Sequence, residues 1–496
     1  MIPTELISIA ITGTFLTGIL IPLKLIDQKK MIRIPLWSSL LVSLLSIYFT
    51  IALHRNGAFL FFGETFIVDK LSLYHLFLIN LVFLSSGIYM QDYFKKARAK
   101  GVQSVFHFQR FSMLWQAFQL MLMIVILSNN IGLTWVAIEA TTILSTFLII
   151  SESDSLSLEA MWKYLLVCSI GIGLAFIGTI LVAAAGREFT DTASMNTFSG
   201  LSLHASHLNP DLMLFAFIFI VVGFGTKAGL APMHTWLPDA HSQAPTPVSS
   251  VFSGVMLNVA LFVIMRYLPI VEGSMGESGD AHSILILLGF LSLLFAAVFI
   301  PIQHDVKRLL AYCSVEHIGI IAIGLGLGGA GTTAALFHSL NHSLSKILAF
   351  FSSGSIIHTY GTRDMRKITG VFRRMPIWGG AFLISMLVLM GVAPFSIFMS
   401  EFMIVETAFN GKRYVLFTLF MMGTIAIFIS MLKYVLDMIF KPGINNSTGL
   451  EKVRFSNRLI IYICIAAFLL LGFWVPPGMM NFLEGAAVIV EKGIRI

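Results

Sequence analysis

The sequence predicts an all-α polytopic membrane protein with about 14 transmembrane helices. Of its 496 residues, 57% are hydrophobic and only 11% are charged, whereas soluble domains carry roughly 25% charged residues. Apolar stretches long enough to cross a bilayer as helices recur along the whole chain. The hydrophilic stretches between them are too short to fold alone, so residues 1–496 are expected to form a single integral membrane domain.

Prolines interrupt two of the expected spans. Pro232 falls in the seventh and Pro394 in the twelfth, and proline breaks a helix because it lacks a backbone donor. Hydrocarbon tolerates broken backbone only where it is buried in protein or lines a cavity. The spans lie near residues 2–24, 34–53, 71–91, 111–128, 131–150, 161–184, 211–231, 246–268, 282–301, 308–328, 331–357, 376–408, 414–440 and 457–475.

The two broken helices lie five spans apart, so they run in opposite directions. This arrangement is typical of inverted-topology repeats, whose sites lie near the bilayer midplane. We therefore expect two inverted-topology five-helix repeats with broken helices 7 and 12. The expected divisions are N-terminal helices at 1–110, a first repeat at 111–268, a second repeat at 282–440, and a last helix and tail at 457–496.

Loop charge predicts the orientation. Clusters of lysine and arginine follow the first, third, eleventh and thirteenth spans, whereas the even-numbered loops carry few. Because cytoplasmic loops are enriched in basic residues, the odd-numbered loops are expected in the cytoplasm and both termini outside.

Lys227 and Glu139 are the first candidates for chemistry. Lys227 lies deep in the seventh span beside the break, and an ionisable group at membrane depth marks a functional site by default. Snorkelling to the interface is the alternative. Glu139 lies in the middle of the fifth span, and Lys227 is its natural cationic partner. Such a pair can switch the lysine between holding and releasing a proton, or can be a static ion pair that fixes helix packing.

A second group lies in the eleventh span. His338, His342 and Lys346 are spaced i, i+4, i+8 and so share one helix face. Histidine titrates near pH 6.5, which favours proton passage. The absence of an HExxH pattern and of a nearby carboxylate in the sequence speaks against a metal site, and none is expected.

Other polar residues complete the expected set. Glu401, just past Pro394, and Lys163, at the start of the sixth span, are further relay candidates, and snorkelling at a helix end is the alternative for both. The residues flanking the seventh-span break are candidates for coupling the site to the cytoplasmic side: His234, Asp239 and His241.

Cofactor chemistry is not expected. The three cysteines, Cys168, Cys313 and Cys464, lie far apart, and no CxxC spacing indicates an iron–sulfur cluster or disulfide framework. The glycines from Gly324 to Gly329 end a membrane helix and follow no strand, so they are not a nucleotide loop. Many protonatable groups without an evident substrate pocket suggest protons as the transported ion.

Six stretches carry a resemblance to a known family: WVAIEATT, EAMWKYLLVCSIGIGLAFIGT, GTKAGLAPMHTWLPDAHSQAPTPVS, QHDVKRLLAYCSVEHIG, HSLNHSLSK and PFSIFMSEF. The chain resembles the antiporter-like, proton-pumping subunits shared by respiratory complex I, membrane-bound hydrogenases and Mrp-type cation/proton antiporters. Within that family it is most similar to component F of hydrogenase-4 and formate hydrogenlyase-type complexes.

The resemblance implies roles for particular residues. Glu139 and Lys227 match the family's fifth-span glutamate and seventh-span lysine, Lys346 its eleventh-span lysine, and Glu401 its twelfth-span terminal charge. Asn258 is a departure, because many members have lysine or histidine there. Asparagine carries no net proton at neutral pH, so the link between the halves is expected to depend on water or His338, or to be weaker.

The expected function is that of a proton-translocating subunit of a multi-subunit redox complex in a prokaryotic inner membrane. Its expected partners are other membrane subunits of a hydrogenase- or complex I-like assembly, the lipid bilayer, and protons or sodium ions; nucleic acid is not expected. Whether the chain counts as part of an enzyme depends on those partners. The alternatives are a cation/proton antiporter or ion-coupled uptake subunit without a redox partner, and a scaffold that conducts nothing.

Overall fold

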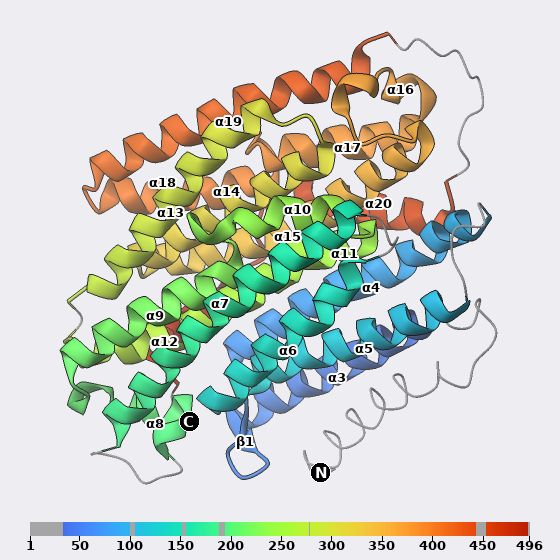
Figure 1. Ribbon diagram of the computed structural model, residues 1–496. Helices are drawn as coiled ribbons and strands as arrows, with labels where there is room; N and C mark the ends of the chain where they lie inside the picture. The colour runs from blue at the N-terminus through green and yellow to red at the C-terminus, as the bar shows by residue number, and fades with distance from the viewer. Residues whose placement is uncertain are drawn as a thin grey trace. The chain divides into compact units, whose positions relative to one another are not determined.

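Figure 1 shows the computed structural model, which describes residues 33–99, 105–150, 155–187, 194–276, 278–442 and 453–494. Helices make up nearly all of this part of the chain, and its one sheet is a two-stranded hairpin. Eleven helical segments among these residues are long and apolar enough to cross a membrane. In hydrocarbon, a helix satisfies all its backbone polar groups internally. The all-α polytopic membrane fold predicted from the sequence is confirmed.

The predicted apolar stretches from 34–53 to 457–475 all coincide with helices. Helix α15 (Ala330–Tyr360) is not among the eleven apolar segments, because its stripe of histidine, serine and lysine residues lowers its hydropathy. The first predicted stretch, residues 2–24, lies outside the described residues. The total of about 14 spans therefore stays a prediction.

Two compact units divide the chain, and the first takes in the described residues of Met1–Ala228, Val255–Ile284 and Phe482–Ile496. Asn130 caps one of its helices by accepting a hydrogen bond from the Leu133 backbone N–H at 2.9 Å. Its elements are α3 (Ile34–Asn56), β1 (Phe59–Phe61), β2 (Phe66–Val68), α4 (Lys70–Ala99), α5 (Val105–Leu127), α6 (Ile131–Ile149), α7 (Ser155–Gly186), α8 (Phe198–Leu203), α9 (Pro210–Ala228) and α12 (Leu257–Ser274).

Helices α7 and α9 lie side by side in the first unit (Figure 1). Glycines permit this close approach: a Cβ built at Gly223 would lie 2.5 Å from the backbone nitrogen of Ala175. A Cβ at Gly178 would lie 2.8 Å from the carbonyl oxygen of Ala216. Membrane helices associate through such small residues because lipid supplies no hydrophobic force between them.

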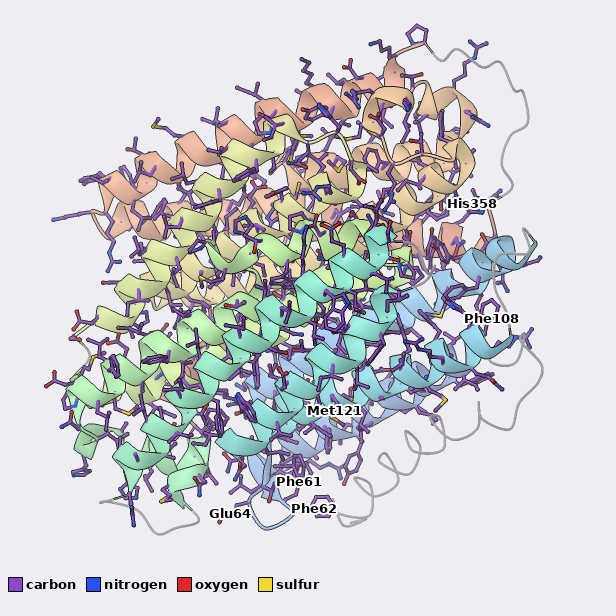
Figure 2. All side chains as sticks on the ribbon, viewed as in Figure 1. Phe61, Phe62, Glu64, Phe108, Met121 and His358 are labelled. Carbon is purple, nitrogen blue, oxygen red and sulfur yellow. The ribbon has the colours of Figure 1, made fainter. Side chains whose placement is uncertain are left out.

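The hairpin β1–β2 is antiparallel and places Phe61 opposite Phe66. Their rings stack with centroids 5.3 Å apart, and Figure 2 shows Phe61, Phe62 and Glu64 together at the hairpin. The side chain of Asn129 donates to the Glu64 carbonyl at 2.9 Å. This bond ties the hairpin to the segment that precedes α6.

The second unit takes in the described residues of Gly229–Gly254 and Leu285–Asn481. In it α14 packs on α15, and α15 packs in turn on α17 and α18. Helices α13 (Asp280–Phe299) and α21 (Pro477–Lys492) contribute residues to both units. The other helices are α10 (Trp236–Gln243), α11 (Thr246–Val251), α14 (Val306–Leu327), α16 (Val371–Arg374), α17 (Pro376–Leu389), α18 (Ser396–Asn410), α19 (Tyr414–Phe440) and α20 (Phe455–Phe473).

Both expected helix breaks are present in the structure. Helix α9 ends before Gly229, which has φ 81°, and α10 begins at Trp236, past Pro232. Helix α17 ends before Gly391, which has φ 66°, and α18 begins beyond Pro394. Positive φ suits glycine because it has no Cβ, so each break joins a glycine turn to a proline.

Candidate functional site

Lys227 occupies the last turn of α9 and is fully buried, with 0% of its surface exposed. Its ammonium donates to the hydroxyl of Thr142 on α6 at 3.0 Å and to that of Tyr164 on α7 at 2.5 Å. The ammonium also lies over the Tyr164 ring, 4.9 Å from its centroid, where the ring face attracts a cation. Three helices of the first unit thus meet at this lysine.

The Tyr164 hydroxyl extends these contacts further into the first unit. It lies 2.6 Å from the hydroxyl of Ser145 on α6, and 3.7 Å from the sulfur of Met256 in the π-helical segment Phe252–Met256. Lys227, Tyr164 and Ser145 therefore form a continuous line of hydrogen-bonding groups. Hydroxyls serve such a line because each can donate as well as accept.

Glu139 is half-buried on α6, near Lys227 but not in ion-pair contact with it. Its Oε1 accepts a hydrogen bond from Ser169 on α7 at 2.8 Å, and its Oε2 is buried with no hydrogen-bond partner among the described residues. Glu139 still interacts electrostatically with Lys227. In this structure Glu139 therefore influences Lys227 without direct contact. That Glu139 switches Lys227 between holding and releasing a proton stays a prediction.

Lys163 is not brought together with these residues. Its ammonium forms an ion pair at 2.6 Å with Glu159, one turn earlier on α7, and the two side chains are 49% and 57% exposed. The neighbouring Tyr164 is fully buried. The structure thus matches the alternative of a lysine at a helix end, and a relay role for Lys163 stays an untested prediction.

In the second unit, His338, His342 and Lys346 form the expected stripe along α15, and all three are fully buried. The Lys346 ammonium donates to the Leu310 carbonyl on α14 at 2.7 Å. Both ring nitrogens of His342 are buried and have no hydrogen-bond partner among the described residues. The stripe therefore faces protein, principally α14.

His338 joins α14 to α18. Its Nε2 lies 3.0 Å from Nδ1 of His317 on α14, and its Nδ1 lies 2.9 Å from the Ser400 hydroxyl on α18. Glu401 on α18 is half-buried, and its carboxylate packs against the backbone of Gly391 at the helix break. One ligand atom each from His317, His338 and Glu401 all lie within 4.8 Å of one another.

The residues expected to couple the site lie in the second unit, in and around α10. His234 is buried with its ring 5.3 Å from that of Phe295, and His241 stacks on Phe350 at 5.5 Å. Asp239 accepts a hydrogen bond from Arg308 at the start of α14. Each of these side chains is held in place by a contact within its unit.

Two further basic residues form hydrogen bonds with backbone carbonyls at the C-terminal end of α10. The Lys307 ammonium donates to the Ala244 carbonyl at 2.7 Å, and Arg363 donates to the Ser242 carbonyl. Basic groups are favourable at a helix C-terminus, where carbonyls are left unpaired. In the adjoining loop, hydrogen bonds from Arg366 hold the pKa of the Asp364 carboxyl below its usual value.

Asn258 is buried in the first turn of α12, directly after the π-helical segment Phe252–Met256. Such π-helical turns are frequent at functional sites. Asn258, the residue that departs from the family pattern, thus lies next to a π-helical turn.

Five buried groups were not predicted from the sequence: Tyr164, Glu316, His317, Arg266 and Asp69. Tyr164 is uncharged, and the charge of the preceding Lys163 makes Lys163 the candidate that the sequence favours. Glu316 and His317 form an EH pair inside an apolar stretch, a signal that could have identified them. Arg266, on α12, donates to Asp69 at 2.6 and 3.0 Å with both side chains buried.

Comparison with known proteins places the chain among membrane subunits. Residues 128–430 match a family described as NADH:quinone oxidoreductase/Mrp antiporter, TM. The hydrogenase-4 component F homolog of Methylacidiphilum infernorum (isolate V4) is 31% identical over 477 residues, covering 94% of this chain and 97% of that protein. Hydrogenase-4 component B of Escherichia coli (strain K12) is 29% identical over 470 residues, covering 88% of this chain and 67% of that protein.

A solved structure shares the fold. A chain of the membrane-bound sulfane sulfur reductase, described as an archaeal respiratory membrane complex, superposes with a TM-score of 0.84 at 21% identity. The match covers 98% of this chain and 97% of that one. The arrangement of helices described above is therefore also found in that complex.

Proposed function

Because the chain belongs to the NADH:quinone oxidoreductase/Mrp antiporter transmembrane family, we propose that it translocates protons as an integral subunit of a multi-subunit redox complex. Lys227, Glu139, His338, His342, Lys346 and Glu401 are the proposed relay groups. A change of charge arriving from a neighbouring subunit alters the interaction of Glu139 with Lys227, and Lys227 then passes its proton on.

The observation that carries this proposal is the hydrogen bonding of Lys227. A buried charge that only fixes helix packing is normally paired with an opposite charge, because an uncompensated one is costly. Lys227 instead contacts two neutral hydroxyls, on Thr142 and Tyr164. A hydroxyl accepts from a protonated lysine and donates to a neutral one, so this environment accommodates both states.

The second unit supports the proposal with groups of the same kind. Lys346 is buried and bonded to a carbonyl. His317, His338 and Ser400 form a hydrogen-bonded series across three helices. Imidazole can accept a proton on one nitrogen and release it from the other, so such a series can pass protons along.

The order of elements supports the inverted repeat as part of the proposal. In the first unit α6 carries Glu139, α7 follows, and the broken helix begins with α9. In the second, α14 carries the buried Glu316, α15 follows, and α17 and α18 form the broken pair. Glu139 and Glu316 each have one buried carboxylate oxygen without a partner among the described residues, as the same position in two repeats would have.

The proposed setting is a prokaryotic inner membrane, with both termini outside and further membrane subunits as partners. Loop charge supports the orientation, and the hydrogenase-4 relatives support the redox assembly. The name of the matching family also includes Mrp antiporters, which keeps a cation/proton antiporter as the second candidate.

Purification of the tagged full-length chain from its native membrane, with partners identified by mass spectrometry, separates the two candidates. The proposal predicts subunits that carry iron–sulfur clusters or a hydrogenase centre, and proton uptake by the reconstituted complex that depends on electron donor and proceeds without sodium. Recovery of small membrane partners alone, with sodium-dependent uptake and no redox activity, would instead establish the antiporter.

A further inference from the structure

Three helices of the second unit bring two imidazoles and a carboxylate to one point. His317 comes from α14, His338 from α15 and Glu401 from α18, and their closest ligand atoms lie within 4.8 Å of one another. The three helices pack on each other in pairs. The positions of the three donors are therefore set by helices rather than by loops, which gives a binding site its precision.

The hydrogen bonds of His338 fix its tautomer and direct Nε2 toward His317. The Ser400 hydroxyl donates to the Ile397 carbonyl at 2.9 Å, so it accepts from Nδ1–H of His338 at 2.9 Å. That bond assigns the proton to Nδ1 and leaves a lone pair on Nε2, which faces His317. Metal-binding histidines are oriented in this way by a second hydrogen bond on the distal nitrogen.

The spacing of the donors suits zinc. Zn–N bonds of about 2.0–2.1 Å in a tetrahedral site place two nitrogens roughly 3.3 Å apart, and Nδ1 of His317 lies 3.0 Å from Nε2 of His338. A carboxylate oxygen of Glu401 lies within 4.8 Å of a ring nitrogen of each histidine. Two histidines and a glutamate are a ligand set found in zinc enzymes.

A second observation points to a ligand at the same place. His342 lies one turn beyond His338 on α15, with its ring 5.2 Å from that of His317. It is fully buried, and neither of its nitrogens has a hydrogen-bond partner among the described residues. A buried imidazole without partners is costly, so a water bound to an ion at this cluster would stabilise His342 by hydrogen bonding to it.

The charges around the cluster partly offset each other. Glu316, beside His317, interacts electrostatically with Glu401 and with Lys346, and Lys346 also interacts with His317 and His342. A divalent cation bound by Glu401 would be drawn to the second carboxylate and repelled by the lysine.

We propose that His317, His338 and Glu401 form a Zn²⁺ site in the second unit, and that the bound ion blocks proton passage there. The ion takes the Nε2 lone pair of His338, the Nδ1 lone pair that His317 offers when its own proton sits on Nε2, and the charge of the carboxylate, so none of the three can then accept a proton. This proposal departs from the expectation, drawn from the sequence, of no metal site. The proposed binding of Zn²⁺ does not depend on the proposed function, whereas the proposed block of proton passage rests on it.

Equilibrium binding of Zn²⁺ to the purified full-length chain in detergent tests the site. The expected result is one tightly bound Zn²⁺ ion per chain. His317→Gln and Glu401→Gln should each reduce the affinity for Zn²⁺ by about 10- to 100-fold or more, because loss of a residue that merely hydrogen-bonds to a metal ligand already costs that much. The matched control is His75→Gln, which changes an equally buried histidine in the first unit and should leave affinity unchanged.

Substitution of Co²⁺ for Zn²⁺ tests the site in the wild-type chain, so this test does not depend on whether the variants fold. The wild-type chain with Co²⁺ in place of Zn²⁺ should show the intense visible absorption of a tetrahedral site with nitrogen and oxygen donors. Absence of any bound ion in the wild type, or binding that survives both His317→Gln and Glu401→Gln, would overturn the proposal. The second result would direct attention to histidines outside the cluster, such as the exposed His207.

Proton uptake measured on the reconstituted complex tests the proposed block of proton passage separately from the binding of Zn²⁺. Loss of uptake at Zn²⁺ concentrations that fill the site, restored by a chelator, supports the block. Binding without any loss of uptake would keep the metal site and contradict the placement of the cluster on the proton path. Absence of binding would remove the metal site and leave the proposed function as it stands.

Discussion

The ion pair between Asp69 and Arg266 predicts a large and specific effect on stability. Arg266 donates two hydrogen bonds to the Asp69 carboxylate, at 2.6 and 3.0 Å, and the side chains are only 1% and 2% exposed. Breaking such a pair from one side leaves a buried charge uncompensated and costs about 3–5 kcal/mol. At 1.4 kcal/mol per factor of ten, this shifts the unfolding equilibrium roughly 100- to 4,000-fold.

The change Asp69→Asn isolates the charge. Asp69 also accepts a hydrogen bond from the Ser72 backbone N–H at 2.8 Å, at the start of α4. Asparagine caps a helix about as well as aspartate, so Asp69→Asn keeps the cap and removes only the ion pair. The double variant Asp69→Asn/Arg266→Met removes both charges, and should cost less than either single change because no buried charge is left.

Denaturant-induced unfolding in detergent micelles, followed by circular dichroism, compares Asp69→Asn, Arg266→Met and the double variant with the wild type. Asp280→Asn is the control, because it removes an exposed carboxylate at the start of α13 and should stay within about 0.5 kcal/mol of the wild type. Single changes that cost under about 1 kcal/mol, or that add up in the double variant, would refute the reasoning.

Three further changes test the site and the packing around it. Tyr164→Phe removes a hydrogen bond to a charged group, worth about 1.5–3 kcal/mol, and should slow proton uptake by the assembled complex about tenfold or more; an unchanged rate would exclude the Tyr164 hydroxyl from the path of Lys227. Glu316→Gln keeps the shape of the side chain but removes its charge, and should likewise slow uptake while leaving the yield of complex unchanged. Gly223→Val places a side chain into the backbone of α7 and should reduce the yield of monodisperse protein, whereas Gly173→Val, which has open space beside it, should not; equal yields would contradict the close packing.

The fold was predictable from the sequence because bilayer thickness and proline leave local signals. Long apolar runs define each membrane helix, and the expected stretches coincide with the helices of the described chain. The interruptions at Pro232 and Pro394 were also predictable, since proline lacks a backbone donor and disfavours a helix interior, although Pro269 lies inside the continuous helix α12. The division into two compact units depends on contacts between distant segments, for which no local pattern exists.

The site was only partly predictable, for a reason visible at Lys163 and Tyr164. Adjacent residues point to different sides of a helix, and only the packing of α7 decides that Tyr164 faces inward. The charged residue was the natural choice from the sequence, yet the tyrosine contacts Lys227. Likewise, nothing local to His317 indicates that Glu401, on another helix, lies beside it.

Proton uptake by proteoliposomes that contain the purified complex, measured for Lys227→Ala with assembly verified, tests most directly whether a buried lysine among hydroxyl groups carries the translocated proton. We predict that electron transfer persists in this variant while coupled proton uptake is lost. Uptake should be unchanged in Lys433→Ala, which alters a lysine on α19, outside the proposed relay. Normal proton uptake by an intact Lys227→Ala complex would contradict the proposed role of the lysine.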